Sequence, residues 1–540
     1  MAHNEEQRPS VSDSDGTAAV GGDPGPAPGS LIVVSNRQPY RHEYASDDAE
    51  SETTTDGGAT TAPSADIDQQ IEVDRPTGGL TAGLDPVLQQ AGGTWIAWGD
   101  GDADDEVADD DGCVSVPPEE GSYTLQRVWL TETEIDGYYR GFSNRVLWPL
   151  CHEFPELAEP RPTFLEWYRA VNRTFAEAVA DHADEDAVVW LQDYHLGLAP
   201  AMVRERVPQT ATIAQFWHVP WPTPAVFEHC PARRELLEGL LGNDLLGFHV
   251  DRYCEAFLDC VERFCPETTV DWHRQVVHHR DGQTRVTATP MGIDAEDHDR
   301  TSRSVDPGEW HDFRERHDIP RGNAIGLGVD RLDYSKGIPE RLDAIERLLE
   351  REPGWRGEFT FVQTATPSRT EIPAYARHGE YVREEIDRIN ARFGGPGWRP
   401  IVYTEEFLPR ETLCALYRRA DAMIVSPLYD GMNLVAKEFV AASVDGDGTL
   451  VLSETAGAHE TLGEFAYAID PTCQEAFAET IDVALTAPSE ERRGRMNGLR
   501  RRVFGRDLEW WMQVQFDELR RVHESATPRN GRRRKRSRSV

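Results

Sequence analysis

Short apolar runs that end in polar residues recur along the N-terminal half of the chain and predict buried β-strands. LIVVSNR (31–37) comes first, followed by VVWLQD (188–193), TIAQFWH (212–218) and LLGFHV (245–250). Stretches with helical periodicity, such as FLEWYRAVNRTFAEAVADH, lie between them. Because buried strands that alternate with helices are typical of a doubly wound sheet, we predict a Rossmann-like α/β domain over 31–295.

A second α/β set begins after residue 320. Its predicted strands lie in AIGLGVDRLD, FTFVQTATP, PIVYTEEF, AMIVSPLYDG and TLVLSETAG, and a helical pattern follows each of them. We predict a second Rossmann-like domain over 321–505, joined to the first by a connection with a helix over 296–320. An amphipathic helix over 506–525 closes the pattern. Doubly wound sheets bind ligands at the carboxyl ends of their strands, so two in succession predict a cleft between the domains.

Four segments show no periodicity and are rich in Gly, Pro, Ser or charge. They are a leader (1–29), an acidic loop (44–70), the stretch DGDADDEVADDDG (100–112) and a basic tail (526–540). We predict that the leader and the tail are disordered and that neither acidic loop packs against the core.

The composition adds a strong negative charge. The chain has 95 acidic and 56 basic side chains, a formal net charge of −39, and only three of the basic residues are lysines against 53 arginines. So much negative charge repels nucleic acid and anionic membranes. Acidic excess with little lysine is typical of proteins in concentrated salt, where screening is short-ranged, so we predict a halophilic protein. Codon usage that favours arginine would also deplete lysine.

The targeting and cysteine patterns favour a cytoplasmic protein. No apolar run approaches the ~20 residues of a membrane-spanning helix, and the N-terminus lacks the layout of a secretory signal. The eight cysteines show no C-x-x-C pair and no zinc-ligand spacing. We therefore predict free thiols and no partnership with membrane or nucleic acid, and leave open whether the chain forms a homo-oligomer.

Two of the three lysines lie in stretches that suggest chemistry. In LGVDRLDYSKG a predicted strand ends near Arg331, and Lys336 follows five residues later. Two cations at the carboxyl edge of a sheet suit a diphosphate, because arginine binds as a planar fork and lysine as a compact charge. The alternative is a surface ion pair of Lys336 with Asp330, Asp333 or Glu340.

The second stretch, SPLYDGMNLVAKEF, runs from a strand through an Asp-Gly turn into a helix with Asn433 as its N-cap. Three amides of the first turn are expected to point at an anion: those of Leu434, Val435 and Ala436. Asp430 is placed to accept hydrogen bonds from sugar hydroxyls, and Glu438 to hold a ribose diol. Lys437 either supports this cluster or faces solvent.

The N-terminal half carries candidates of the same kind. Arg37 ends the first predicted strand, while Gly78 and Gly79 open a turn into a helix that lacks the G-K-[ST] of a P-loop. Asp193 and His218 each follow a strand of one predicted sheet, although a histidine at a strand end is usually structural. Two aromatic residues in YYRGFSNRVLWP suit either stacking on a sugar or a buried core: Tyr139 and Trp148.

Together these stretches resemble the trehalose-6-phosphate synthase family, retaining nucleotide-sugar glucosyltransferases of GT-B architecture. The resemblance covers residues 31 to about 525. It is carried in order by VVSNR, GGL, YYxxFSNxVLWP, DYHL, HxPxPTP, DLLGFH, MGI, RLDYSKGIPER, PSR, SPLxDGMNLVAKEFVA and LVLSExAGA. It implies an acceptor-binding N-terminal domain and a nucleotide-sugar-binding C-terminal domain that face each other across a cleft.

The resemblance also implies roles for the matching residues. Glucose-6-phosphate is bound or bordered by Arg37, Tyr139, Trp148, Asp193 and Arg369. The nucleotide-glucose donor is bound by Gly78, Gly79, Arg331, Lys336, Leu408, Asp430, Leu434, Val435, Ala436, Lys437 and Glu438. Four residues are expected to be catalytic: His218, Asp430, Arg331 and Lys336.

The implied reaction moves glucose from UDP-glucose, or another nucleoside-diphosphate glucose, to glucose-6-phosphate with retention at the anomeric carbon. The departing phosphate oxygen takes the acceptor proton, so no carboxylate nucleophile is required. The cations replace a divalent metal, and no cofactor is expected besides the co-substrate. The product would serve trehalose biosynthesis and osmoprotection, with a separate trehalose-6-phosphate phosphatase acting downstream.

Two alternatives stay open from the sequence. A glucosylglycerol-phosphate synthase shares the donor half but uses another acceptor, although the presence of Tyr139, Trp148 and Arg369 favours a hexose phosphate. A non-catalytic homologue that senses sugar phosphates would usually lose donor-site residues, and this chain keeps them. The sequence does not specify the nucleobase of the donor.

Overall fold

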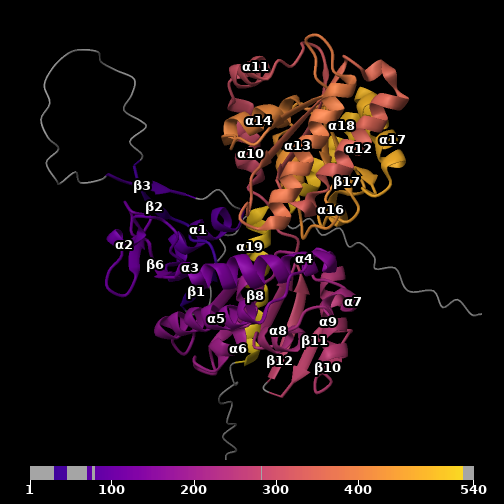
Figure 1. Cartoon of the computed structure of the whole chain (residues 1–540). Coiled ribbons are helices and arrows are strands. Elements are labelled where there is room, and N and C mark those ends of the chain that lie inside the picture. The colour runs from indigo at the N-terminus through magenta and orange to yellow at the C-terminus, as the bar shows by residue number, and fades with distance from the viewer. Residues whose placement is uncertain (1–29, 46–69, 76–78, 281, 527–540) are drawn as a thin grey trace, which may run out of the picture.

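The computed structural model describes residues 30–45, 70–75, 79–280 and 282–526. The predicted leader, most of the acidic loop 44–70, Gly78 and nearly all of the tail lie outside the described residues. Within these ranges the chain forms two α/β halves, each built on its own large sheet (Figure 1). A short antiparallel ribbon, β2 (Arg41–Tyr44) with β3 (Ile71–Asp74), stands beside the first half.

The first sheet has ten strands in the order β10-β11-β12-β9-β8-β7-β1-β4-β6-β5. The run from β12 to β6 is parallel, and antiparallel pairing is confined to the edges. The four strands predicted from periodicity are β1, β7, β8 and β9. The bounds are β1 Leu31–Ser35, β4 Thr94–Trp98, β5 Cys113–Val116, β6 Tyr123–Val128, β7 Val188–Gln192, β8 Thr212–Phe216, β9 Leu245–Phe248, β10 Thr269–Asp271, β11 Val276–His279 and β12 Gly282–Ala288.

The second sheet has six strands, all parallel, in the order β15-β14-β13-β16-β17-β18. All five predicted strands are present, and β18 adds an edge that the periodicity did not indicate. The bounds are β13 Ala324–Arg331, β14 Phe359–Thr366, β15 Ile401–Thr404, β16 Ala422–Val425, β17 Thr449–Ser453 and β18 Tyr467–Ile469. The predicted α/β class with two doubly wound sheets is confirmed.

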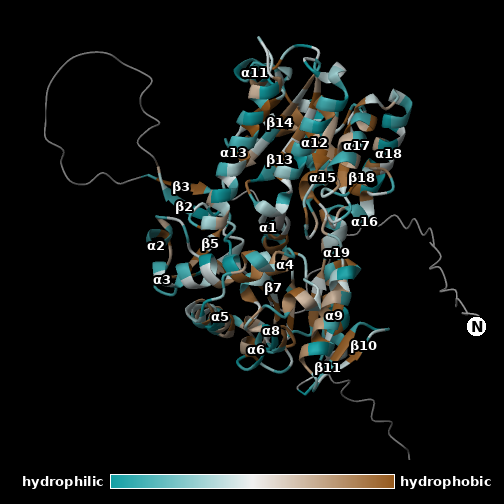
Figure 2. Ribbon diagram, turned by 45° about the vertical axis from the view of Figure 1, so that its right-hand side comes forward, coloured by the Kyte–Doolittle hydropathy of each residue, from teal (hydrophilic) through white to brown (hydrophobic). Residues whose placement is uncertain are grey.

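Helices surround both sheets, so that apolar strands lie inside a more polar helical layer (Figure 2). In the first half they are α1 Gly79–Ala91, α2 Asp104–Val107, α3 Glu132–Glu134, a π-helix Ile135–Leu147, α4 Trp148–Cys151, α5 Pro162–His182, α6 Ala199–Arg204, α7 Pro224–Phe227, α8 Arg233–Leu240 and α9 Asp251–Phe264. In the second half they are α10 Ala295–Ser304, α11 Pro307–Arg316, α12 Ile338–Arg351, α13 Pro373–Phe393, α14 Arg410–Arg419, α15 Leu434–Ala442, α16 His459–Leu462, α17 Gln474–Thr486 and α18 Ser489–Gly505. The last helix in the chain is α19 Leu508–Ala526. Short 3-10 turns lie at Pro155–Leu157, Tyr194–Leu196, Tyr334–Lys336 and Pro353–Trp355.

The last helix, α19, returns from the second half and packs against β8 and β9 of the first sheet. Trp511 on α19 stacks on Trp190 with ring centroids 5.8 Å apart, and its edge contacts Phe216 at 5.1 Å. The apolar face predicted for α19 is therefore buried against the first sheet, whose strands lie far from α19 in the sequence (Figure 1). The chain passes from the first half to the second after β12 and returns before α19. These two crossovers lie together, since a Cβ atom on Gly292 would lie 2.1 Å from the carbonyl carbon of Asp507.

The prediction that the acidic stretch 100–112 would not pack is wrong. Asp104 begins α2 with its side chain fully buried, and Arg127 pairs with it at 3.0 Å. A buried carboxylate with a guanidinium partner and backbone donors is stable inside a protein, whereas the sequence pattern shows only a run of acids. The connection predicted over 296–320 contains two helices, and α10 and α11 contact α15 and α14.

Candidate active site

A cavity of about 550 Å³ lies between the carboxyl ends of the two sheets. The first half contributes the turns after β1, β7, β8 and β9. The second half contributes the ends of β13 and β14 and the turns after β13, β15 and β16. Ten of the residues predicted from the sequence line it: Arg37, Asp193, His218, Arg331, Lys336, Leu408, Asp430, Leu434, Val435 and Glu438. The edge at which doubly wound sheets bind ligands thus becomes one shared pocket.

The two halves approach closely at one glycine. A Cβ atom on Gly431 would lie 2.2 Å from the carbonyl oxygen of His218. Across the same boundary, the Tyr253 hydroxyl donates to the carbonyl oxygen of Asp430 at 2.9 Å. The turn after β16 is therefore held against the first half at the point where His218 and Asp430 both reach the cavity.

Lys336 and Asp430 form an ion pair inside this cavity. The Nζ atom lies 2.6 Å from Oδ2 of Asp430, and the side chains are 13% and 12% exposed. Burial would raise the pKa of Asp430, but the charge and hydrogen bond of Lys336 outweigh it and lower the pKa. The surface ion pair considered as the alternative is wrong, because the partner of Lys336 is the buried Asp430, while Asp330 pairs with Arg341 at 2.6 Å.

Arg331 is the last residue of β13 and brings a second cation to the cavity. Its guanidinium lies 5.4 Å from the ring centroid of Trp148. Behind it, Asp333 is fully buried; desolvation would raise the pKa of that carboxyl, but Arg331, Arg369 and Lys336 lower it to about 2. The cavity thus holds two cations backed by a carboxylate that stays ionised.

The first turn of α15 closes the cavity from the second half. Asn433 caps the helix as predicted, since its side chain accepts from the Ala436 amide at 3.1 Å. The Ala436 amide therefore donates to the cap. The expectation that it points at an anion is wrong. The amides of Leu434 and Val435 remain, which a first helical turn cannot satisfy internally. Both residues line the cavity, so an anion there would meet the positive end of the helix dipole.

Lys437 and Glu438 on α15 have different surroundings. Lys437 is 2% exposed, and its Nζ donates to the carbonyl oxygen of Met291 at 2.5 Å. Burial, followed by the charge of Arg506, lowers the pKa of Lys437 to about 7. The alternative in which Lys437 faces solvent is wrong. The side chain joins α15 to the segment around Met291 and does not line the cavity. Glu438 does line it and accepts from the Tyr417 hydroxyl at 3.1 Å.

On the first half, Asp193 and His218 face the cavity from neighbouring strands. Asp193 Oδ1 accepts from the backbone amides of Tyr194 at 2.9 Å and His218 at 3.2 Å. Desolvation raises the pKa of Asp193 to about 6 despite these bonds and two nearby arginines. Desolvation also lowers the pKa of His218 to about 3, so its imidazole is neutral, and Nε2 donates to Oε1 of Gln192 at 3.0 Å.

Arg369, Tyr139 and Trp148 lie beside the cavity and do not line it. The Arg369 guanidinium stacks 4.0 Å from the Trp148 ring centroid and donates to the hydroxyls of Tyr375 at 2.5 Å and Tyr194 at 3.2 Å. Desolvation would raise the pKa of Tyr139, but Arg369 and Arg37 lower it. Three residues predicted to bind or border the acceptor, Arg369, Tyr139 and Trp148, therefore lie together beside the cavity.

Strained backbone marks the same region. Among the described residues, six that are not glycine have positive φ, and three of them belong to this site: Asp193 (69°), Arg369 (52°) and Asn433 (74°). Such conformations cost about 1–3 kcal/mol each and persist where the surrounding structure fixes them. The site is thus built at the expense of local stability.

The sequence interpretation missed His195, which lines the cavity next to Asp193. Its side chain is buried, and neither ring nitrogen has a hydrogen-bond partner among the described residues. The ring stacks on Tyr139 at 5.7 Å with planes 14° apart. Desolvation, then Arg369 and Arg37, keep the pKa of His195 well below its usual range, so the ring is neutral. The signal was present in DYHL, two residues after Asp193.

The described residues contain neither a candidate metal centre nor a helix that could span a membrane. No group of three or more His, Cys, Asp and Glu side chains there is arranged to hold a metal ion. None of the helices described is long and apolar enough to cross a membrane. All eight cysteines are free thiols. Gly79 begins α1, whose Thr81 lines the cavity, while Gly78 lies outside the described residues.

Comparison with known proteins places this chain among glycosyltransferases. The model of glycosyltransferase family 20 matches residues 31–521. A trehalose-6-phosphate synthase of Mycolicibacterium vanbaalenii is 39% identical over 460 residues, 84% of this chain and 92% of its own. A bifunctional trehalose-6-phosphate synthase/phosphatase of Thermoproteus tenax is 38% identical over 483 residues, and the matched part is 89% of this chain but only 62% of that protein.

Solved structures agree with these matches. A trehalose-phosphate synthase of Burkholderia xenovorans, in complex with glucose-6-phosphate, has a TM-score of 0.77 and 32% identity, covering 91% of this chain and 100% of its own. A protein of E. coli bound with UDP-2-fluoro glucose also has a TM-score of 0.77, with 31% identity and coverage of 91% and 99%. The fold is thus similar to the folds of proteins solved with glucose-6-phosphate or with UDP-2-fluoro glucose.

Proposed function

The chain belongs to glycosyltransferase family 20, and we propose that it transfers glucose from UDP-glucose, or another nucleoside-diphosphate glucose, to glucose-6-phosphate. The product would be α,α-trehalose-6-phosphate with retained anomeric configuration. One observation carries the proposal: Arg331, Lys336 and the N-terminus of α15 face Arg37, Asp193 and His218 across a single cavity. A site with an arginine on each side, and Lys336 beside one of them, suits two anionic sugars.

The second half would bind the donor. Arg331, Lys336 and the amides of Leu434 and Val435 supply positive charge for a diphosphate. Glu438 is positioned by Tyr417 and would accept hydrogen bonds from the ribose hydroxyls. Leu408 is buried, lines the cavity and would border the base.

The acceptor would be bound mainly by the first half, with Arg369 contributed by the turn after β14 of the second half. Arg37 lines the cavity, and Arg369 is aimed by two tyrosine hydroxyls and the Trp148 ring, an arrangement that suits a phosphate group. Asp193 would accept hydrogen bonds from sugar hydroxyls, and its position beside His218 puts those hydroxyls near the donor glucose. Neutral His218 has its Nε2 proton committed to Gln192, which leaves Nδ1 as an acceptor.

The mechanism that fits these groups is a front-side displacement. The bond from the anomeric carbon to the diphosphate oxygen breaks, a bond to the acceptor hydroxyl oxygen forms, and the hydroxyl proton passes to the departing diphosphate. Arg331, Lys336 and the dipole of α15 stabilise the charge that develops on the leaving group. Asp430 is held by Lys336 and needs no role as a nucleophile. We propose that these cations supply the positive charge that other transferases take from a divalent metal.

The test is a panel of donors and acceptors. UDP-, GDP-, ADP- and TDP-glucose are each incubated with glucose-6-phosphate or glycerol-3-phosphate, in EDTA and in high salt, and the product is identified by mass and NMR. Trehalose-6-phosphate formed from glucose-6-phosphate alone supports the proposal. Product from glycerol-3-phosphate would favour the glucosylglycerol-phosphate synthase. If no nucleotide is released with either acceptor, the result would favour a non-catalytic sensor.

We propose four further properties of this protein. A cytoplasmic location, a separate downstream phosphatase, a homo-oligomer and a role in osmoprotection all rest on the sequence or on the family resemblance. Free thiols at all eight cysteines are consistent with a reducing compartment.

A further inference from the structure

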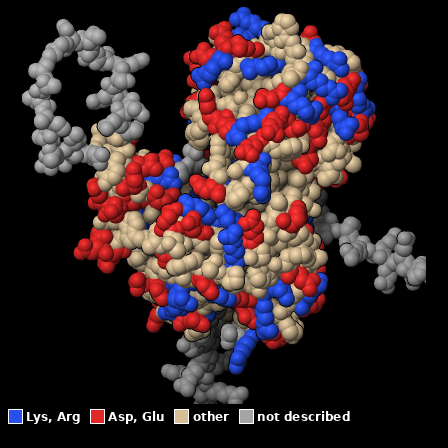
Figure 3. Space-filling model, in the orientation of Figure 1, with Lys and Arg blue, Asp and Glu red and all other residues tan. Residues whose placement is uncertain are grey.

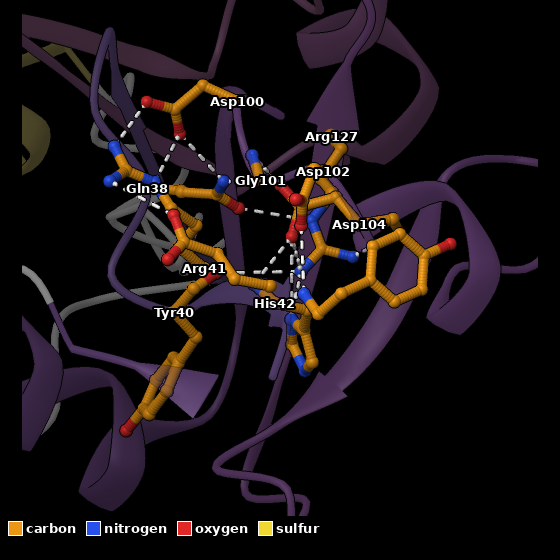
Figure 4. Close-up of polar contacts among 11 residues, drawn as sticks. Gln38, Tyr40, Arg41, His42, Asp100, Gly101, Asp102, Asp104 and Arg127 are labelled. Carbon is orange, nitrogen blue, oxygen red and sulfur yellow. Dashed lines mark hydrogen bonds and ion pairs between the residues drawn. The ribbon is translucent and has the colours of Figure 1, made fainter. Parts of the chain in front are cut away.

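The turn that follows β1, which carries Arg37 to the cavity, is bound from one side by the buried carboxylate of Asp104 (Figure 4). Gln38 donates to it through Nε2, and the backbone amide of His42 donates at 2.9 Å. Arg127 pairs with Asp104 at 3.0 Å and also donates to Gln38 Oε1 at 3.1 Å. Desolvation would raise the pKa of Asp104, but its bonds to His42 and Gln38 lower it to about 2, so the carboxylate stays ionised.

The same turn is bound from the other side by a second carboxylate, Asp85 on α1. The hydroxyl of Tyr40, a fully buried residue, lies 3.0 and 2.9 Å from the two oxygens of Asp85. Gln89, one turn later on α1, donates to Asp85 at 2.8 Å, and the Tyr123 hydroxyl on β6 donates at 2.7 Å. Asp85 is therefore the point at which the turn, the helix and the sheet meet.

Tyr40 thus connects two elements that line the cavity from different places. Arg37 lies three residues before it, on the side expected to bind the acceptor phosphate. Helix α1 begins at Gly79, which the family resemblance places at the donor, and its Thr81 lines the cavity. Neither Tyr40 nor Asp85 lines the cavity itself, so neither is suited to touch a substrate. A small shift of the turn relative to α1 would change the width of the cavity between its acceptor and donor sides.

We propose that Tyr40 and Asp85 are positioning residues whose hydrogen bond fixes the Arg37 turn against helix α1, and so couples binding of the sugar-phosphate acceptor to binding of the nucleotide-sugar donor. The identity of the two ligands rests on the proposed function. Because Asp104 holds the turn on its far side, loss of the Tyr40 hydroxyl leaves the turn folded but free to shift against α1. If the bond were merely structural, its loss would lower stability but would not change how binding of one ligand affects the affinity for the other.

The test compares Tyr40→Phe with a matched control, Tyr123→Phe. Each variant keeps its aromatic ring and removes one hydroxyl donor from the same carboxylate, but Tyr123 joins α1 to β6 and not to the Arg37 turn. Both are expected to lower Tm by a similar amount. Tyr40→Phe should raise KM for glucose-6-phosphate about tenfold, equivalent to about 1.4 kcal/mol. Tyr123→Phe should leave that KM within about twofold.

The coupling is measured without turnover. The Kd of UDP is determined by calorimetry in the absence and in the presence of saturating glucose-6-phosphate. The ratio of the two values is expected to differ from one in the wild type and to move toward one in Tyr40→Phe, while Tyr123→Phe keeps the wild-type ratio. Because Asp85→Asn weakens the same bond from its other end, the double variant Tyr40→Phe/Asp85→Asn should raise the acceptor KM no more than the larger single change.

Equal KM values in Tyr40→Phe and Tyr123→Phe would overturn the positioning role, and a wild-type ratio of one would overturn the coupling. Additive effects in the double variant would show that the two residues do not act through one bond. Absence of turnover in the wild type, with the binding ratio intact, would contradict the proposed function alone and leave the positioning role in place.

Discussion

The ammonium group of Lys336 lies 2.6 Å from a carboxylate oxygen of Asp430, and this pair spans 94 residues of sequence inside the cavity. Lys336 was expected to bind the donor diphosphate and Asp430 to accept from sugar hydroxyls, and here their opposite charges neutralise each other. A donor diphosphate would share Lys336 with Asp430, so the lysine acts from a fixed position. Removing the lysine also leaves a buried carboxylate without its main partner, which is costly.

Lys336→Ala should therefore lower both turnover and stability. Loss of one leaving-group contact raises the barrier by about 3 kcal/mol, or about 10² in kcat. The Tm should fall as well, because Asp430 loses its counter-charge. Steady-state kinetics and calorimetry check both effects. Arg347→Ala, which removes an exposed partner of Glu475, is the control and should change neither. Near-normal kcat/KM in Lys336→Ala would remove Lys336 from the mechanism.

Arg369→Ala should raise the KM for glucose-6-phosphate sharply, at least tenfold, and leave the donor KM within about twofold. Arg369→Lys should not restore affinity, because a lysine cannot reproduce the fork that reaches two tyrosine hydroxyls or stack on Trp148. Arg383→Ala, on the exposed side of α13, serves as the control. An unchanged acceptor KM in Arg369→Ala would contradict its assignment to the acceptor phosphate.

Acceptor binding should depend on the ionisation of Asp193. Its pKa is raised to about 6 by desolvation, so the carboxylate that accepts from sugar hydroxyls is lost as pH falls through that value. In the wild type, kcat/KM for glucose-6-phosphate should fall below pH 6. The sugar phosphate itself titrates near pH ~6, so the comparison is with Asp193→Asn, whose profile should retain only the phosphate limb. Superimposable profiles would exclude ionised Asp193 from acceptor binding.

Lys437 should make stability rise with pH above neutrality. Its pKa is lowered from 10.5 to about 7, chiefly by burial, so between these values the unfolded chain binds a proton that the folded chain does not. Unfolding therefore becomes less favourable as pH rises through this window, and the penalty for the charged amine is fully present below about pH 7. Urea unfolding of the wild type and Lys437→Met from pH 7 to 10 should show a smaller slope in the variant. Equal slopes would contradict the shift.

Activity should rise with KCl into the molar range before KM values climb. The formal net charge is −39, and on the face shown in Figure 3 acidic side chains gather around α2 while both signs are mixed over the second half. Salt screens the repulsion among exposed carboxylates more than it weakens contacts in the partly buried cavity. Full activity and an unchanged Tm in 50 mM salt, a low ionic strength at which repulsion is hardly screened, would contradict the halophilic prediction.

Local chemistry made much of the fold predictable. The strands that were found, β1, β7, β8, β9 and β13 to β17, are short apolar runs whose burial follows from their own residues. Asn433 caps α15 because its side chain reaches an amide only three residues later. The cations Arg331 and Lys336 reach the cavity because one ends a parallel strand and the other lies in the turn after it, and ligands bind at the carboxyl ends of such strands.

The tertiary structure decided which polar side chains are buried and with what. Asp104 lies in a run of acids and Lys437 in an ordinary helical pattern, yet both are buried because partners distant in sequence, Arg127 and the carbonyl of Met291, meet them there. The hydrogen bond from Tyr40 to Asp85 depends on how the turn after β1 packs against α1. Contacts of this kind arise from the packing of whole elements, which sequence periodicity does not encode.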